Sequence, residues 1–376
     1  MVIGILKENS SENRVAILPG EVIVLKKLNL SIFVETGAGE RAYSDDQDYV
    51  KAGAVIVNRK ELISGSDLLL AVNPPVEEPA GVFRRGQVIC SLLYPYENGA
   101  WIETMRTAGI TYLALDLIPR ITRAQSMDVL SSMATVAGYK AVLHAASLLP
   151  RFFPMFMSAS GTIKPARVLI LGAGVAGLQA LAISRKLGAI VEVFDVRSAV
   201  RDEVKSLGGK FIEVEGARED SAAGGYAVEQ TEEFRQKQSQ MIQKSAVAAD
   251  IIICTAQIPG KKAPVLITAE TARSMKPGSV IIDMASSTGG NCELTEHGRN
   301  ISVNMIKIIG KTDYPSEMPS DASRMFGNNI INLLKLVINK EGNAEINLSD
   351  EIIKGTLAFY NGDFVSERIK QILKIE

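Results

Sequence analysis

The residues best suited to chemistry lie in the middle of the chain, where the apolar run RVLIL leads into a glycine-rich turn. The turn reads Gly172-Ala173-Gly174-Val175-Ala-Gly177, and apolar residues at helical spacing follow it. Glycines at this spacing let a backbone approach the pyrophosphate of a dinucleotide, and the start of the helix supplies free N–H groups. The sequence therefore predicts a dinucleotide-binding βαβ unit. The alternative is a glycine-rich turn that binds no ligand.

An acidic residue, Asp195, ends the next strand-like run, IVEVF. A carboxylate at this place is expected to accept hydrogen bonds from the adenosine ribose hydroxyls and to repel a 2′-phosphate, which favours NAD over NADP. Arg197 lies two residues later and leaves the phosphorylated cofactor as the alternative.

Composition narrows the class of protein. With 376 residues the chain suits two domains, and its 41 Lys and Arg against 42 Asp and Glu give no electrostatic case for binding nucleic acid or an anionic membrane. The three cysteines, Cys90, Cys254 and Cys292, are too scattered for a disulfide framework or a metal site. No apolar run is long enough to span a bilayer, so we expect a cytoplasmic chain whose membrane contact, if any, passes through another protein.

Strand-like and helix-like runs alternate twice along the chain, which predicts an α/β fold with two Rossmann-like doubly wound lobes separated by a cleft. Residues 131–310 form the Rossmann lobe that carries the glycine turn. Residues 1–130 form the other lobe, which the tail, residues 311–376, completes with a helix and a hairpin turning at Asn361-Gly362.

Two polar loops are candidates for ligand contact. The first, residues 119–132, carries arginine, glutamine, aspartate and serine, which suit the carboxamide of a nicotinamide; the alternative is a solvated connection. The second, residues 216–226, is small and polar with a Gly-Gly-Tyr end, and we interpret it as a flap; the alternative is a disordered surface loop.

Several longer motifs carry a resemblance to a known family: PRITRAQSMDVLSS, PARVLILGAGVAGLQA, AGGYA, IPGKKAPVLIT and GGNCELTE. Together they resemble the NAD(H)-binding component of proton-translocating nicotinamide nucleotide transhydrogenases, over nearly the whole chain. Alanine dehydrogenase is similar in fold, so the two activities compete as interpretations.

Chemistry separates these two activities. Oxidative deamination needs a general acid–base group, whereas hydride exchange between two nicotinamides needs the rings held together and water excluded. In chains similar to alanine dehydrogenase, a substrate lysine falls at Asn73, a catalytic histidine at Tyr94 and an acidic residue at Ser287. Those roles are empty in this sequence. Arg14 matches an arginine of both families and does not discriminate.

The resemblance also implies a site, residue by residue. Gln125 is expected to position both rings, and Arg120 and Asp128 to hold the carboxamide, so these three are the candidate catalytic residues. The remaining expected cofactor contacts are Ser126, Met127 and Ser131 of the same loop, Gly172, Ala173, Gly174, Val175 and Gly177 at the pyrophosphate, Asp195, Val196 and Arg197 at the ribose, and Gly225, Tyr226, Gln238 and Gln257.

By the same resemblance, this chain binds NAD(H) while NADP(H) lies on a partner subunit, and membrane-spanning subunits couple the reaction to proton translocation. A homodimer and peripheral attachment to the membrane through these partners are expected, and no metal. A stand-alone alanine or amino-acid dehydrogenase and a non-enzymatic NADH-binding regulator remain the alternatives.

Overall fold

The computed structural model describes residues 1–214 and 232–375. The chain divides into two compact units, which we call unit 1 (Met1–Met133 with Pro315–Glu376) and unit 2 (Ala134–Tyr314). The expected division fell three to four residues earlier at both crossings. It differs because α5 (Val129–Leu148) is one continuous helix, so that no loop or turn in the sequence marks the first boundary.

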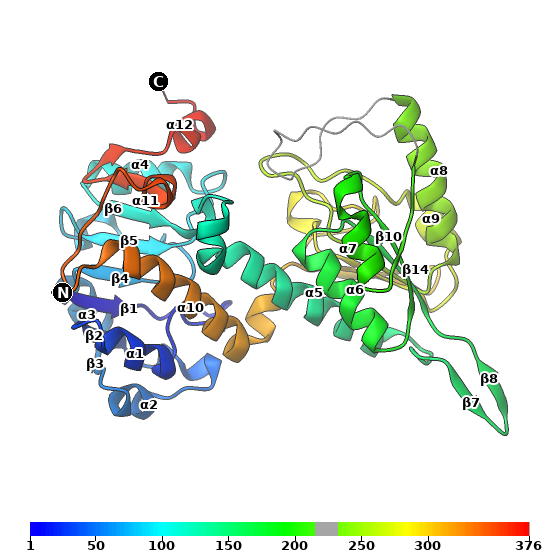
Figure 1. The fold of residues 1–376 in the computed structure, drawn as a ribbon, viewed down its shortest axis with the longest axis horizontal. Coiled ribbons are helices and arrows are strands. Elements are labelled where there is room, and N and C mark those ends of the chain that lie inside the picture. Colours follow the sequence, from blue (N-terminus) through cyan, green and yellow to red (C-terminus); the bar gives the residue numbers. More distant parts are fainter. Residues whose placement is uncertain (215–231, 376) are drawn as a thin grey trace. The chain divides into compact units, whose positions relative to one another are not determined.

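Unit 1 is built on an eight-stranded sheet (Figure 1). Its six parallel strands run in the order β3-β2-β1-β4-β5-β6, the usual order of a doubly wound fold, which reverses between β1 and β4. The strands are β1 (Val2–Ile5), β2 (Ser31–Glu35), β3 (Val55–Val57), β4 (Leu68–Leu70), β5 (Val88–Ser91) and β6 (Thr111–Ala114).

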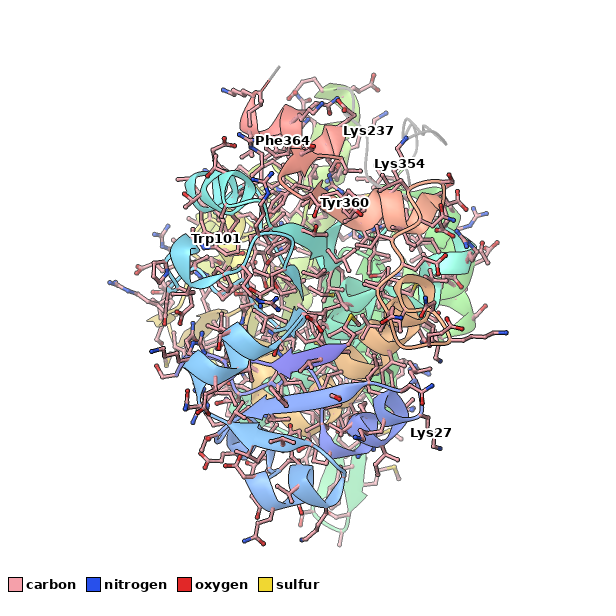
Figure 2. All side chains as sticks on the ribbon, turned by 90° about the vertical axis from the view of Figure 1, so that its left-hand side faces the viewer. Lys27, Trp101, Lys237, Lys354, Tyr360 and Phe364 are labelled. Atoms are coloured by element: carbon pink, nitrogen blue, oxygen red, sulfur yellow. The ribbon has the colours of Figure 1, made fainter. Side chains whose placement is uncertain are left out.

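The tail of the chain completes this sheet, as the sequence predicts. Strand β16 (Leu357–Tyr360) pairs antiparallel with β6, and β17 (Asp363–Phe364) pairs with β16. Asn361 and Gly362 have φ values of 50° and 91°, the left-handed values that a two-residue hairpin turn needs. Phe364, Tyr360 and Trp101 mark this end of unit 1 in Figure 2, and Trp101 meets the buried ring of Tyr112 edge-on, with 5.8 Å between centroids.

The helices of unit 1 pack around the sheet with apolar sides inward. In α10 the fully buried side chains Phe326, Ile330, Leu333 and Leu334 recur at intervals of three and four, the period of a helix face that covers a core. The unit 1 helices are α1 (Pro19–Lys26), α2 (Asp46–Lys51), α3 (Arg59–Gly65), α4 (Gly99–Thr107), α10 (Pro319–Val337), α11 (Glu351–Thr356) and α12 (Glu367–Leu373).

Unit 2 contains a seven-stranded sheet of the order β11-β10-β9-β12-β13-β15-β14, parallel except for β14. Side chains of β9 alternate between two apolar cores, Val168 and Ile170 on one face and Leu169 and Leu171 on the other, as expected for a sheet covered on both faces. The strands are β9 (Arg167–Leu171), β10 (Ile190–Phe194), β11 (Lys210–Phe211), β12 (Ile251–Cys254), β13 (Val280–Asp283), β14 (Asn300–Val303) and β15 (Ile306–Gly310), and the helices are α6 (Val175–Lys186), α7 (Arg201–Ser206), α8 (Glu232–Ala248) and α9 (Ala269–Ser274).

A separate hairpin, β7 (Phe156–Ser158) and β8 (Gly161–Ile163), extends away from the unit 2 sheet (Figure 1). Its apolar side chains are exposed, and Phe152 stacks on Phe156 with 5.0 Å between ring centroids. Within the described ranges, no helix is both long and apolar enough to cross a bilayer.

Candidate functional site

The glycine turn of unit 2 follows β9, at the point where the strand order of the sheet reverses. Gly172 has a φ of 99°, and a Cβ at this residue would lie 2.6 Å from Thr255 Oγ1. A Cβ at Gly177 would lie 1.9 Å from the carbonyl oxygen of Gly172. The packing of the protein itself therefore requires glycine at both positions.

Gly174 differs from these two glycines. A Cβ added to it would meet nothing within 4 Å, and its backbone, with φ −76° and ψ −173°, is extended. Gly174 is the N-cap of α6 and no side chain caps the helix there. Open space thus lies against the start of α6, between buried Ala173 and exposed Val175, where the helix presents N–H groups and a partial positive charge. These residues fit a pyrophosphate.

Asp195 joins the glycine turn to the end of β10. Its side chain is only 6% exposed and accepts hydrogen bonds from Ala173 N (2.7 Å) and from the backbone N, Nε and Nη2 of Arg197 (2.9, 2.9 and 2.7 Å). Donation to Asp195 raises the pKa of the Arg197 guanidinium. Val196, between them, is partly buried against the core.

The loop after β12 lines the other side of the reversal point. Thr255 donates its N–H to Leu171 O (2.8 Å), and its hydroxyl lies 3.0 Å from Gly172 O. Gln257 is exposed and donates Nε2 to Met284 O (3.1 Å). Gln238 is 9% exposed on α8, while Gly225 and Tyr226 lie outside the described residues.

Two residues that sequence reasoning missed hold this loop in place. Asn291 accepts from Ala256 N (3.0 Å) and donates to Ala256 O (2.9 Å) and Pro264 O (2.8 Å). Asp283, fully buried at the end of β13, accepts from the N–H of Asn291 (2.8 Å) and from three further donors. An aspartate that ends the apolar run VIID, followed by GGNC, was the available signal.

The loop of unit 1 predicted to face the nicotinamide is anchored rather than freely solvated. It forms the 3-10 helix Thr122–Met127, in which Ala124 and Met127 are buried. Ser126 O accepts from two asparagines of α10, Asn329 (2.8 Å) and Asn332 (3.1 Å).

The polar side chains of this loop differ in what they are free to do. Both carboxylate oxygens of Asp128 accept from Ser131, one from its N–H (2.9 Å) and one from its hydroxyl (2.6 Å), so Asp128 caps the start of α5. Gln125 and Arg120 are exposed. Among the described residues, none hydrogen-bonds the side-chain amide of Gln125, which is therefore available to a ligand.

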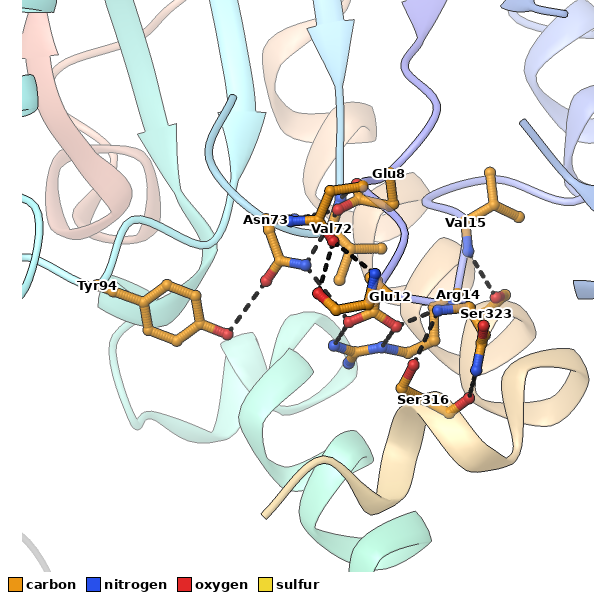
Figure 3. Close-up of polar contacts among 12 residues, drawn as sticks. Glu8, Glu12, Arg14, Val15, Val72, Asn73, Tyr94, Ser316 and Ser323 are labelled. Atoms are coloured by element: carbon orange, nitrogen blue, oxygen red, sulfur yellow. Dashed lines mark hydrogen bonds and ion pairs between the residues drawn. The ribbon is translucent and has the colours of Figure 1, made fainter. Parts of the chain in front are cut away.

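A buried polar cluster lies where the strand order of unit 1 reverses, after β1 and β4 (Figure 3). Glu8 accepts from Val72 N (2.7 Å), Asn73 N (3.3 Å) and Asn73 Nδ2 (3.0 Å). Burial raises the pKa of Glu8 to about 7, even though these hydrogen bonds oppose the shift.

Arg14 and Glu12 form a bidentate ion pair in the same cluster, with Nε–Oε1 at 2.8 Å and Nη2–Oε2 at 2.6 Å, and both side chains are 9% exposed. Burial alone would raise the pKa of Glu12, but the contacts with Arg14 lower it. The planar fork of Arg14 is thus occupied by a carboxylate of the protein.

Asn73 and Tyr94, the positions singled out by comparison with alanine dehydrogenase, meet in this cluster, with Tyr94 Oη 3.4 Å from Asn73 Oδ1. Tyr94 has a φ of 49°, and the carboxylate of Asp116 holds this turn by accepting its N–H (2.9 Å). Burial raises the pKa of Tyr94. Ser287 belongs to unit 2, in a 3-10 helix after β13. The described part of the chain contains no group of three or more His, Cys, Asp or Glu side chains that could hold a metal ion.

Comparison with known proteins adds two family matches and several relatives. Residues 4–137 match the family described as Alanine dehydrogenase/PNT, N-terminal domain, and residues 141–367 match Alanine dehydrogenase/PNT, C-terminal domain. The chain is 44% identical over 375 residues to an NAD(P) transhydrogenase subunit alpha chain of Rhodospirillum rubrum, covering 97% of this chain and 98% of that one. It is 27% identical over 384 residues to alanine dehydrogenase of Mycolicibacterium smegmatis, covering 100% and 97%.

Solved structures give the same order of similarity. The structure of a transhydrogenase from Sinorhizobium meliloti is 39% identical, with a TM-score of 0.88 over 97% of this chain and 100% of that one. An L-alanine dehydrogenase structure is 24% identical, with a TM-score of 0.81 over 100% and 99%, and shows a shared fold. The predicted α/β fold with two doubly wound units is confirmed by these structures.

Proposed function

We propose that this chain, which belongs to the alanine dehydrogenase/PNT family, is the NAD(H)-binding component of a proton-translocating NAD(P) transhydrogenase. The observation that carries the proposal is the 44% identity to a transhydrogenase subunit alpha chain along nearly the whole of both chains, against 27% to an alanine dehydrogenase.

The polar cluster of unit 1 supports this choice. Deamination of an amino acid needs a side chain that takes up and returns a proton near neutral pH. Asn73 does not titrate, and burial raises the pKa of Tyr94 further from neutrality. Arg14 already pairs with Glu12, so its guanidinium is not free for a substrate carboxylate. Hydride exchange between two nicotinamides requires none of these groups.

In this proposal unit 2 binds the pyrophosphate and adenosine of NAD(H). The N–H groups at the start of α6 hold the pyrophosphate, and the missing side chain of Gly174 admits it. Asp195, Val196 and Arg197 contact the adenosine ribose, Gln257 contacts the adenine, and Gln238 contributes less directly.

Unit 1 carries the loop that holds the nicotinamide. The bound cofactor supplies a hydride, which passes reversibly between C4 of its ring and C4 of NADP(H) on a partner subunit. The amide of Gln125 orients the ring, because it is exposed and unoccupied by other described residues. Arg120 donates to the carboxamide, while Asp128 and Ser131 fix the end of the loop to α5. Positioning, not proton transfer, is the task of these residues.

The partners follow from the same proposal. They are an NADP-binding subunit and membrane-spanning subunits that couple hydride transfer to proton translocation, and the chain associates with the cytoplasmic face of the membrane through them. A homodimer of this chain is part of the proposal.

The direct test is reduction of an NAD+ analogue by NADPH, measured with this chain alone and with an added NADP-binding transhydrogenase domain. Activity is expected only when the domain is added. A parallel reaction with alanine and NAD+ should show no turnover. Turnover of alanine by the chain alone would establish the amino-acid dehydrogenase instead, and NADH binding without transfer in either mixture would indicate a regulator.

Gln125→Asn tests the positioning role. Shortening the side chain by one methylene should slow hydride transfer by at least about tenfold while leaving NADH affinity nearly unchanged, because small displacements of reacting atoms are costly in rate. The same substitution at exposed Gln47 of α2 is the matched control and should change neither quantity. Weaker NADH binding at an unchanged transfer rate would contradict the role of Gln125.

A further inference from the structure

The carboxylate of Asp195 is saturated with hydrogen bonds from the protein itself. Oδ1 accepts from the backbone N and Nε of Arg197, both at 2.9 Å. Oδ2 accepts from Ala173 N and from Nη2 of Arg197, both at 2.7 Å. An ionised carboxylate offers about four acceptor positions, so none remains for a ribose hydroxyl.

Only two of these four donors can leave without distorting the fold. The N–H of Ala173 belongs to the glycine turn, and the backbone N–H of Arg197 is fixed by its place directly after β10. The guanidinium, in contrast, lies at the end of a long side chain that is 29% exposed, against 6% for Asp195. Its departure would free two acceptor positions, the number that the two hydroxyls of a ribose require.

The neighbourhood offers the displaced guanidinium another acceptor. Glu203, exposed on α7, is close enough for its charge to act on Arg197. The other cations of this segment already have carboxylates, since Arg201 pairs with Asp202 and Glu213, and Lys205 pairs with Glu213.

We propose that Arg197 competes with the adenosine ribose for Asp195, must turn away when NAD(H) binds, and thereby determines specificity at the 2′ position. While the pair is closed, the guanidinium neutralises the carboxylate that would otherwise repel a 2′-phosphate. Arg197 therefore lowers the affinity for NAD(H) and weakens discrimination against NADP(H). The inference rests on the proposed NAD(H) binding.

Calorimetric titration with NADH and with NADPH tests this competition in the wild-type chain and two variants. Arg197→Met removes the guanidinium and keeps an apolar stem. We expect its Kd for NADH to fall by about three- to tenfold, the range for losing a partly exposed ion pair. Its Kd for NADPH should rise or stay beyond the measurable range. Arg201→Met removes an equal charge from the same segment without touching Asp195, and should leave the ratio of the two constants unchanged.

The outcomes separate the inference from the function on which it rests. Weaker NADH binding by Arg197→Met would make Arg197 a direct cofactor ligand and overturn the competition, as would an unchanged Kd or tighter NADPH binding. Arg197→Lys, which keeps the charge but not the planar fork, should lie between wild type and Arg197→Met, and it decides the question if the methionine variant unfolds. Failure of the wild-type chain to bind NADH would overturn the proposed function and the inference with it.

Discussion

Alanine at Gly174 and alanine at Gly177 should have opposite effects, because only one of these glycines makes room for the protein. The Cβ of an alanine at 174 meets nothing within 4 Å on an extended backbone. Such a change restricts the unfolded chain and is expected to stabilise the fold by about 0.4–1 kcal/mol. At 177 the added Cβ lies 1.9 Å from Gly172 O, so the backbone must shift, and overpacking of this kind costs roughly 1–3 kcal/mol or more.

The effect on NADH follows from the same geometry. A methyl group at 174 would stand between the start of α6 and the pyrophosphate and prevent at least one charge-assisted hydrogen bond. Such a bond is worth about 1.5–3 kcal/mol, so the Kd should rise roughly 10- to 150-fold. Gly177→Ala should weaken binding too, but only together with a loss of stability.

Calorimetric titration with NADH and thermal unfolding followed by circular dichroism measure the two quantities separately. We expect Gly174→Ala to keep or slightly raise the Tm while losing affinity, and Gly177→Ala to lower the Tm by roughly 2–12 °C. The reasoning would be refuted if Gly174→Ala bound NADH like wild type, or if it melted as early as Gly177→Ala.

Two further predictions concern the polar networks. Because burial raises the pKa of Glu8 to about 7 from 4.5, its contribution to stability is complete below pH about 4.5 and is lost as the pH rises through 7. The urea midpoint should therefore fall between pH about 5 and 8, and Glu8→Gln should flatten that slope; an identical slope in the variant would show that another group is responsible. Asn291→Ala should lower the free energy of unfolding by about 1–3 kcal/mol and raise the Kd for NADH, because the loop after β12 loses its ties at Ala256 and Pro264. Asn291→Asp, which keeps only the acceptor, should be intermediate in both chemical unfolding and NADH titration, and equal Kd values in all three proteins would contradict the positioning of this loop by Asn291.

Local backbone demands were predictable from the sequence. The glycine turn after RVLIL and the hairpin at Asn361-Gly362 depend on residues that favour positive φ, and they lie where the residue types predict. The exposed hairpin at residues 156–163 was missed, although Ser-Gly between two short runs was a usable signal. Strand β11 covers only Lys210–Phe211 of the longer apolar run that predicted it.

Pairings between polar side chains were harder to predict, because several donors compete for each acceptor. The sequence suggested Asp195 as a ribose acceptor but not that Arg197 occupies it. It suggested Asp128 for the carboxamide, whereas the structure shows that carboxylate at the start of α5. Whether a glycine serves packing or open space, as at 177 and 174, depends on neighbours such as Thr255 that are distant in sequence.

The discontinuity of unit 1 has a consequence for how the chain acquires its structure. Backbone groups near the start of the chain depend on hydroxyls about three hundred residues later: the N–H of Asn13 donates to Ser316 and that of Val15 to Ser323. Strand β6 likewise waits for β16 to cover its edge. During synthesis unit 2 is complete before α10 and β16 leave the ribosome, so unit 2 can fold first while residues 1–133 remain an unfinished sheet with an exposed edge. That interval, rather than the equilibrium stability of the finished protein, is when unit 1 is most vulnerable to aggregation and to proteolysis.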